Sequence, residues 1–567
     1  MTILKVFGIL VVVFLGYHGL LSLLQHRRLS YLSKKHGCAP PVTQAMRWPW
    51  GAERIVRILR FRGDILDGLI SPSFYRTGAW TIRATMPLAL QPLMLVAEPA
   101  NVKAVLSTSF ADWGVGPRRL KQFGPFLGLG IFTADGHSWS SARGILRPVF
   151  SRHQVSDLEF TSRHVDRLLD CLSASEDATP AGTWTDWVDA MPLIYRFTMD
   201  AATEFLFGES VDSQLRPGTV SDRRNVFEQA FETSSMGVGG RMRLGAFYWV
   251  LNHAVFRRAC QLCRTYVSGF VDRTLGLPHD KEKKYQRGLF LRQLSELTQD
   301  RELIRDQLLQ LLFAGRDTTA TLISFALLCL ARDPTAWSKL RAEVLAHSAN
   351  SLSFESLKSC SYLQAVLSET LRLYPPIPIN TRQALRDTVL PVGGGPDGDQ
   401  PVAIPKGTTL TYSVYVMHRR TDIWGENAAE WCPDRWQGLK GGFHYLPFNA
   451  GPRHCPGQQF ALTEASYTLA RLAQSFDMIE CPDPTQPIQK TLGITVHPTR
   501  GVEVRFRKAA HNRRSHQHCE DAACSARDEE EAKKREVATI DEICGSQDRL
   551  VLKRQVQLPS RKVNLKS

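Results

Sequence analysis

The strongest constraint on the fold is one long apolar run in the second half of the chain. The spacing predicts a helix from about Arg301 to Ala331 that is apolar on nearly every face from Leu308 onward. Such a helix either lies in the middle of a core or crosses a membrane. Arg316 and Asp317 interrupt the run near its centre, and charges inside a bilayer are costly. We therefore expect a large, mostly helical domain built around this helix.

A polar stretch, Ala314 to Thr319, lies inside the apolar helix. Glycine and adjacent threonines are poor helix formers, so we expect the helix to open locally there. Asp317 and Thr318 are suited to relay protons to a bound molecule. The residues alone leave two interpretations open: a proton relay, or a threonine-rich kink without chemistry.

A second strong pattern is the loop from Phe448 to Gly457, which reads F-x-x-G-x-R-x-C-x-G. A cysteine thiolate can bind iron, and Gly451 and Gly457 let the loop approach a flat macrocycle closely. Arg453 offers a planar fork of donors to a propionate group. The helix expected after the loop presents its N-terminus to the sulfur of Cys455, which stabilises the thiolate. The alternative is a buried free cysteine in a tight turn.

Two weaker patterns point to the same kind of site. Glu369 and Arg372 form E-x-x-R on a helix expected from about 362 to 373, and Arg435 in P-x-R-W would complete a buried network with them. Trp139 and Arg143 lie four residues apart on another expected helix, where both can reach a propionate. Taken singly, a surface ion pair and a tryptophan packed on an arginine stem explain these patterns as well.

With these patterns in this order, the sequence resembles the cytochrome P450 superfamily over roughly residues 50 to 507. The resemblance implies a mostly α fold with a small β-rich lobe, the cytochrome P450 fold, preceded by an N-terminal transmembrane helix. Further stretches resemble the fungal n-alkane and fatty-acid ω-hydroxylase group in particular. These stretches are residues 129–136, 146–148, 393–398, 415–420 and 457–465.

The resemblance implies a role for each matching residue. Cys455 is the axial thiolate ligand, and so the metal ligand, of haem b, while Asp317 and Thr318 are catalytic residues that deliver protons. The other haem-binding residues implied are Trp139, Arg143, Arg382, Phe448, Gly451, Arg453 and Gly457. The residues implied to hold the fold around the haem are Glu369, Arg372 and Arg435. The residues implied to line the substrate pocket are Phe313, Ala314, Ile377, Ile379 and Ile494. One departure from the group is His454, which stands where an aliphatic residue is common.

The expected activity is a haem-thiolate monooxygenase that hydroxylates an unactivated C–H bond with O₂. Its electrons come from NADPH through NADPH–cytochrome reductase, with cytochrome b5 as a second donor. The substrate expected first is a lipophilic small molecule, a fatty acid or alkane oxidised at its end. Two alternatives stay open: the alkyl chain of a secondary metabolite such as a polyketide, and a haem-binding protein without monooxygenase activity. No nucleic-acid module is recognisable, so we expect no nucleic-acid partner.

The ends of the chain differ from its body. Val6 to Leu24 carries no charge and basic residues follow at once, which predicts an uncleaved, single-pass anchor and a cytosolic catalytic domain. A cleaved signal peptide is the alternative, but its basic residues belong before the apolar run. The expected division is an anchor at 1–28, a proline-marked linker at 29–50, a catalytic domain at 51–507 and a charged, disordered tail at 508–567. The expected location is the endoplasmic reticulum membrane, in contact with lipid, and twelve irregularly spaced cysteines fit a reducing compartment.

Overall fold

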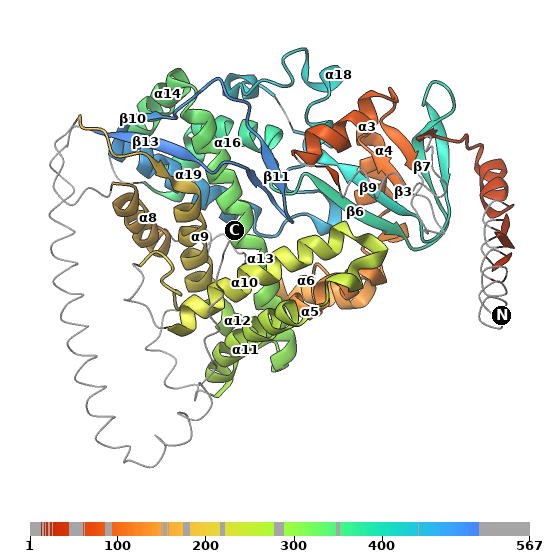
Figure 1. Ribbon diagram of the computed structural model, residues 1–567, viewed down its shortest axis with the longest axis horizontal. Coiled ribbons are helices and arrows are strands. Elements are labelled where there is room, and N and C mark those ends of the chain that lie inside the picture. Colours follow the sequence, from red (N-terminus) through yellow and green to blue (C-terminus); the bar gives the residue numbers. More distant parts are fainter. Residues whose placement is uncertain are drawn as a thin grey trace, which may run out of the picture. The chain divides into compact units, whose positions relative to one another are not determined.

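The computed structural model (Figure 1) has a first compact unit that ends at Ala509 and a second unit formed by residues 510–567. The residues it describes are 27–44, 63–84, 93–148, 158–173, 182–215, 222–276, 289–347, 352–439 and 441–509, with scattered positions between 13 and 24 and at 60, 61, 150 and 156. Most of the expected membrane anchor lies outside the described residues, and so does the expected tail beyond 509.

Helices make up most of the first unit, as the sequence predicts. The longer helices are α5 (Pro117–Leu127), α6 (Gly136–Leu146), α8 (Glu159–Leu172), α9 (Ala190–Phe207), α10 (Asp222–Arg243), α11 (Ala254–Gly276), α12 (Leu289–Leu297), α13 (Arg301–Leu330), α14 (Pro334–His347), α16 (Ser361–Leu373) and α19 (Gln458–Ser475). Shorter helical segments are η2 (Leu66–Ile70), α3 (Ser71–Tyr75), α4 (Pro99–Lys103), η3 (Ala104–Thr108), η4 (Phe110–Asp112), η5 (Gly245–Leu251), α15 (Phe354–Ser359), α17 (Val414–Met417), α18 (Thr421–Trp424), η8 (Pro433–Trp436) and η9 (Gly451–Arg453).

The predicted central helix is α13. The carboxylate of Asp300 caps it by accepting the amides of Glu302 and Leu303. Among the described residues α13 is the one helix long and apolar enough to cross a membrane, and 83% of its most apolar window is buried in protein. It is therefore a core helix, in contact with α5, α9, α11, α14, α16 and α19.

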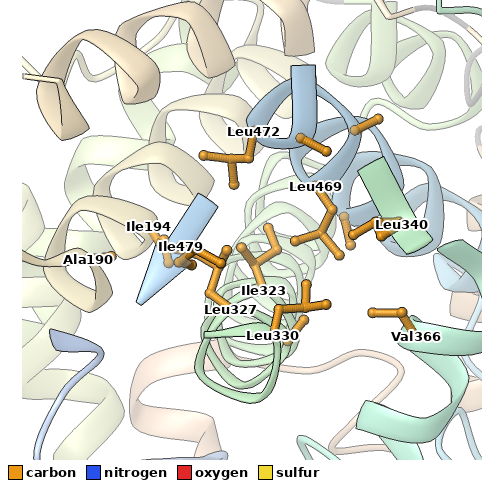
Figure 2. Close-up of a cluster of buried hydrophobic side chains, with 14 of the residues drawn as sticks. Ala190, Ile194, Ile323, Leu327, Leu330, Leu340, Val366, Leu469, Leu472 and Ile479 are labelled. Atoms are coloured by element: carbon orange, nitrogen blue, oxygen red, sulfur yellow. The ribbon is translucent and has the colours of Figure 1, made fainter. Parts of the chain in front are cut away.

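The main core forms where α9, α16 and α19 meet the second half of α13. Figure 2 shows Ile323, Leu327 and Leu330 of α13 pointing at Leu469 and Leu472 of α19. All five side chains are fully buried. Truncating one such leucine to alanine costs about 2–5 kcal/mol of unfolding free energy. This packing holds the second half of α19 against α13, and α19 begins directly after the loop that contains Cys455.

The strands form one larger sheet and three small ones. Their bounds are β1 (Val42–Gln44), β2 (Thr81–Ala84), β3 (Leu93–Val96), β4 (Trp113–Gly114), β5 (Val188–Asp189), β6 (Ile379–Ala384), β7 (Thr388–Gly394), β8 (Gln400–Ile404), β9 (Thr409–Ser413), β10 (Phe476–Glu480), β11 (Lys490–Leu492), β12 (Val496–Pro498) and β13 (Glu503–Lys508). Figure 1 shows β3, β6, β7 and β9 toward the right of the view, and β10 and β13 at the left. The six-stranded sheet has the order β1-β2-β3-β9-β6-β4. The sequence shows a β-type alternation at 79–94, 407–415 and 501–507, and the strands β2, β3, β9 and β13 lie in or at the end of these stretches.

The predicted proline-marked linker is partly built into this lobe. The Ala39 amide donates to the carbonyl of Pro401 at 2.9 Å, and the Gly395 amide donates to the carbonyl of Pro40 at 3.1 Å. A β-carbon on Gly394 would lie 2.6 Å from the carbonyl oxygen of Ala39, so only glycine fits there. Arg28 adds an ion pair to the turn before β7, at 2.7 Å from Asp387. Residues 38–44 are thus a fixed part of the body, while 45–50 lie outside the described residues.

Candidate active site

The cysteine loop runs from the end of a turn at Leu446 through η9 and into α19. The Cys455 amide donates to the carbonyl of Phe448 at 2.9 Å, which closes the loop. Gly451 has φ +68°, and a β-carbon there would lie 1.8 Å from the carbonyl oxygen of Leu106. This glycine therefore allows both the backbone conformation and the close approach. Gly457, which precedes the first turn of α19, donates its amide to the Cys455 sulfur.

Two effects act on the sulfur in opposite directions. Burial raises the pKa of the Cys455 thiol to about 11, while the Gly457 amide and the charge of Arg143 lower it. A bound metal ion deprotonates a coordinating thiol outright, so a cation at the sulfur suits this environment. His454 is exposed, and its ring lies against Arg143, with 3.2 Å between Nε2 and Nη2.

Arg453 joins the loop to the segment before α6. Its Nη2 donates to Asp135 at 2.6 Å and to the carbonyl of Ala134 at 3.0 Å. Trp139 of α6 lies against the same guanidinium, with 4.4 Å between Cζ and the ring centroid. The Nε of Arg453 is buried without a hydrogen-bond partner among the described residues.

Two further arginines share this region and create an excess of positive charge. Burial lowers the pKa of Arg453 to about 10, against the effect of Asp135, and the charges of Arg382 and Arg119 lower it further. Burial also lowers the pKa of Arg119 to about 10, and Arg382 adds to that effect. Asp135 is the one carboxylate that acts on both groups among the described residues. Three guanidinium groups beside one carboxylate require a further anion.

This donor set fits the haem that the sequence patterns imply. Its two propionates would supply the anions that the cluster of Arg119, Arg382 and Arg453 requires, in the charge-assisted geometry that arginine favours. The thiol of Cys455 would provide the ligand, and the close-packed Gly451 would provide the clearance for a flat macrocycle.

The polar stretch of α13 differs from its prediction. The expected opening of the helix is wrong: α13 runs unbroken through it, and the Thr318 hydroxyl donates to the carbonyl of Ala314 at 2.6 Å. From Asp306 to Leu330 every residue is buried except Ala314, Gly315 and Thr318, which are half-buried. These three lie on one face of the helix, at i, i+1 and i+4. That face is the place where a ligand can touch the core helix.

Asp317 belongs to a neighbouring buried pair. Its carboxylate lies 3.1 Å from Nη1 of Arg316, whose guanidinium also lies over the ring of Tyr195 on α9. Burial raises the pKa of Asp317, against the lowering effect of Arg316. The structure thus places Asp317 and Thr318 on adjacent faces of α13, with Asp317 directed to its arginine.

Glu464 is a buried acid that the sequence reasoning missed. It lies on α19, nine residues after Cys455, and hydrogen bonds to Thr319 on α13. Burial raises the pKa of Glu464 to about 8, so the neutral acid predominates at neutral pH. Nothing in its local sequence marks it, because the contact depends on the packing of α19 against α13.

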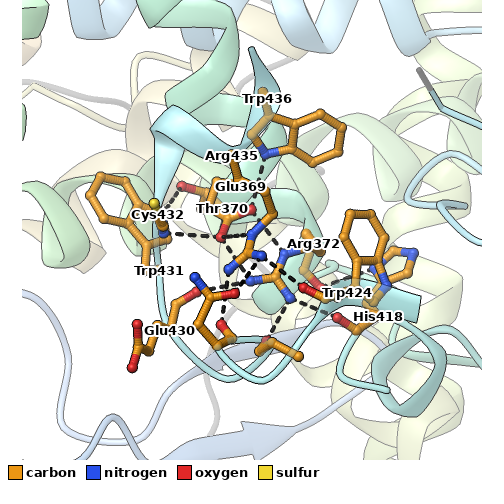
Figure 3. A network of polar contacts seen from close by, with 12 residues as sticks. Glu369, Thr370, Arg372, His418, Trp424, Glu430, Trp431, Cys432, Arg435 and Trp436 are labelled. Carbon is orange, nitrogen blue, oxygen red and sulfur yellow. Dashed lines mark hydrogen bonds and ion pairs between the residues drawn. The ribbon is translucent and has the colours of Figure 1, made fainter. Parts of the chain in front are cut away.

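The expected Glu–Arg–Arg network is present and fully buried at its centre (Figure 3). Arg372 donates to both carboxylate oxygens of Glu369, at 2.8 and 2.7 Å, and Arg435 and Trp436 donate to the same carboxylate at 3.3 and 2.9 Å. Arg372 also donates to three backbone carbonyls, those of His418, Ala428 and Glu430. Every member of the network therefore has partners, as a buried charge requires.

His418 connects this network to the cysteine loop. Burial lowers the pKa of its imidazole to about 3, so the ring is neutral. Nδ1 lies 3.0 Å from the carbonyl of Arg372, and Nε2 accepts the Leu446 amide at 2.9 Å. The cysteine loop thus begins at Leu446, whose amide is bound to the Glu369 network through His418.

Comparison with known proteins decides the family. The family model described as Cytochrome P450 matches residues 84–504 of the chain. The chain belongs to the cytochrome P450 family.

Relatives at about 40% identity cover most of this P450. Cytochrome P450 monooxygenase milC of Cordyceps militaris is 40% identical over 502 residues, 85% of this chain and 94% of that protein. Cytochrome P450 52A3-A of Candida maltosa is 43% identical over 429 residues, 72% of this chain and 80% of that protein. Cytochrome P450 monooxygenase himC of Aspergillus japonicus is 43% identical over 430 residues, 73% and 74% of the two chains. The protein is a cytochrome P450 monooxygenase, a family with a haem-thiolate cofactor, and its resemblance to the fungal hydroxylase group is confirmed.

The residues expected around the substrate fall into two places in this P450. Phe313 packs edge-on against Phe123 and Phe126 of α5, in the same apolar cluster as Ile494. Ile379 packs in another cluster with Phe325 and Leu492, and the half-buried Ile377 lies in the turn between α16 and β6. The sequence analysis did not identify Phe123 and Phe126 of α5 as neighbours of Phe313, because this contact joins segments far apart in the chain.

The Glu369→Gln variant tests the network. Glutamine has nearly the same shape but no charge, and it leaves Arg372 buried without its anion. We expect a loss of about 3–5 kcal/mol of unfolding free energy, measured by urea denaturation. The matched control is Arg273→Gln, which breaks an exposed pair with Glu209 in which both side chains are about 60% exposed, and it should cost about 1 kcal/mol or less. Equal effects in the two variants would contradict a buried network.

Proposed function

We propose that Cys455 is the axial ligand of haem b and that this P450 hydroxylates the end of a long apolar chain, as found in fatty acids and alkanes. The observation that carries the proposal is the half-buried face of α13, where the small Ala314 and Gly315 stand beside the hydroxyl of Thr318. The other side chains expected around it are Phe313, Ile377, Ile379 and Ile494, all apolar. Apart from the Thr318 hydroxyl, such a surface is apolar and suits the end of an alkyl chain.

Each polar group near that face has one task. Bound haem supplies the oxygen activation that a thiolate ligand favours. The Thr318 hydroxyl donates to Ala314 and keeps its lone pairs free to accept a proton donor at the face. Asp317, with its pKa raised by burial, is the group that brings protons to that hydroxyl. Arg119, Arg382 and Arg453 hold the propionates, and Trp139 supports Arg453.

The electrons come from NADPH through NADPH–cytochrome reductase, and cytochrome b5 serves as a second donor. The formal net charge of +15 favours an acidic partner surface. The proposed site of action is the endoplasmic reticulum membrane, with residues 1–28 as a single-pass anchor and the catalytic domain in the cytosol. This location places the catalytic domain next to a lipophilic substrate dissolved in the membrane.

A second candidate is oxidation of an alkyl chain that belongs to a larger secondary metabolite. Coverage of the chain does not separate the two candidates, because milC aligns with 85% of this chain and Cytochrome P450 52A12 of Debaryomyces hansenii aligns with 86%. Both candidates share the haem ligand, the proton path and the apolar pocket. The two candidates differ only in the chemical groups of the substrate that lie far from the oxidised carbon.

Cys455→Ser tests the ligand. Serine removes the thiolate but keeps the loop, so the purified protein should lose the red-shifted Soret band that a thiolate gives the reduced carbonyl complex. Cys481→Ser, at a half-buried cysteine outside the site, should keep that band. A normal thiolate spectrum in Cys455→Ser would refute the assignment.

Thr318→Ala tests the proton path. The variant should keep the haem spectrum but form at least about tenfold less product per NADPH consumed, releasing the difference as hydrogen peroxide. Thr318→Ser, which retains the hydroxyl, should restore most of the coupling. If alanine couples electrons to product as well as threonine does, Thr318 has no role in proton delivery.

A binding screen separates the two substrate classes. Fatty acids and alkanes should displace water from the haem iron and shift its absorption, with affinity rising along the homologous series by about 0.8 kcal/mol per buried CH₂. Polyketide acids of equal chain length are the comparison set. Shifts with polyketide acids alone would favour the second candidate.

A further inference from the structure

A cleft outside the haem site lies where α5, α11 and α13 meet, helices that are neighbours in Figure 1. Its volume is about 430 Å³. Arg257, Arg264, Thr265 and Ser268 of α11 line one side, and Arg305 of α13 lines the other. Two helices thus direct three guanidinium groups and two hydroxyl groups toward one space.

The cleft carries more positive than negative charge. Arg305 donates through Nε and Nη2 to one oxygen of Asp306, at 3.0 and 2.8 Å, and Arg264 reaches the same oxygen at 3.4 Å. Arg257 bonds to the backbone carbonyl of Asn252 and is exposed. The three arginines and Asp306 together leave a charge of about +2. Glu302 lies 3.5 Å from Arg305, but its side chain is 81% exposed and screened by water.

We propose that this cleft binds a phosphate group. A phosphate monoester carries a charge of about −1.5 to −2 near neutral pH, which matches the charge of the cleft, whereas one carboxylate supplies only −1. Guanidinium forks bind phosphate oxygens bidentately, and the hydroxyls of Thr265 and Ser268 offer additional donors. The cleft shares no lining residue with the haem site, so this proposal goes beyond the monooxygenase activity.

Asp306 connects the cleft to the haem site. Its second carboxylate oxygen accepts the Leu129 amide at 2.9 Å. A β-carbon on the adjacent Gly128 would lie 1.8 Å from that oxygen, so the loop is in tight contact with the carboxylate. Further along, the same loop supplies the carbonyl of Ala134 and the carboxylate of Asp135 to Arg453.

This connection gives the bound phosphate a structural effect. A phosphate that takes up hydrogen bonds from Arg264 and Arg305 changes their hold on Asp306, and Asp306 holds residues 128–135. Phosphate binding therefore affects the position of the arginine cluster through the Asp306 carboxylate and the loop at residues 128–135. The loop overlaps the stretch 129–136 that resembles the fungal hydroxylase group.

The test uses full-length holoprotein in uncharged detergent micelles, titrated with sodium phosphate at constant ionic strength. The measured quantity is the midpoint of thermal unfolding, which rises in a saturable way when a ligand binds only the folded state. The variants are Arg257→Gln and the double variant Arg257→Gln, Arg264→Gln. The matched control is Arg258→Gln, an exposed arginine on the same helix that does not line the cleft.

We expect saturation in the natural protein and in Arg258→Gln. The apparent Kd for phosphate should rise at least about tenfold in Arg257→Gln, since a hydrogen bond to a charged group is lost. Phosphate also stabilises proteins in general by exclusion from their surface, so a linear rise of equal slope in all four proteins would overturn the proposal. The same holds if no rise is seen in the natural protein. Arg257→Gln alone decides the question if the double variant does not fold.

The source of the phosphate is decided with lipid nanodiscs. Discs of phosphatidylcholine are compared with discs that also contain phosphatidic acid, without soluble phosphate. A higher midpoint in the phosphatidic acid discs that Arg257→Gln abolishes identifies a lipid headgroup. Saturation by soluble phosphate, with equal midpoints in both discs, identifies a free phosphate compound.

Discussion

Buried positive charge beside the cysteine loop is the constraint around which this P450 is organised. Arg119, Arg382 and Arg453 come from α5, β6 and the loop itself, and Asp135 offsets only part of their charge. Such a cluster is tolerated only when a further anion joins it. The Cys455 thiolate in turn requires a nearby cation, because burial raises the pKa of the thiol and so disfavours the charged form. In the proposed site, one dianionic porphyrin with iron and two propionates would meet both requirements, and its binding would then stabilise this region.

The rest of the fold keeps these groups in place from two directions. On one side the Glu369 network reaches the loop through His418 and Leu446. On the other side α19 packs on α13 through a leucine-rich interface and one polar contact, Glu464 with Thr319. A neutral acid at that contact lets two helices approach without burying a charge, which is cheaper than an ion pair at the same depth.

Local patterns were readable from the sequence and contacts between distant segments were not. The cysteine loop was predictable because its glycines, arginine and cysteine act within ten residues, and α13 because its apolar run is longer than a surface helix allows. The Glu369 network followed from two motifs far apart in the chain, but only the structure shows His418 carrying it to Leu446. Arg119 was missed because it resembles its exposed neighbour Arg118. The opening of α13 was wrongly predicted because propensity was weighed without the tertiary packing, which keeps Gly315 and Thr318 helical.

Residues 38–44, which form a fixed part of the β-rich lobe, limit how far the chain can be shortened from its N-terminus. β1 is the outermost strand of the six-stranded sheet and pairs in parallel with β2 through Val42, Thr43 and Gln44. A truncation that removes all residues before 45, chosen to make the enzyme soluble, also removes β1, the strand that pairs with β2. The bared backbone amides and carbonyls of that strand then form a template for pairing with a second molecule. A truncation that ends before Arg28 keeps β1 paired with β2. A truncation that extends past β1 removes the membrane-anchoring region but exposes an unpaired edge strand that favours aggregation.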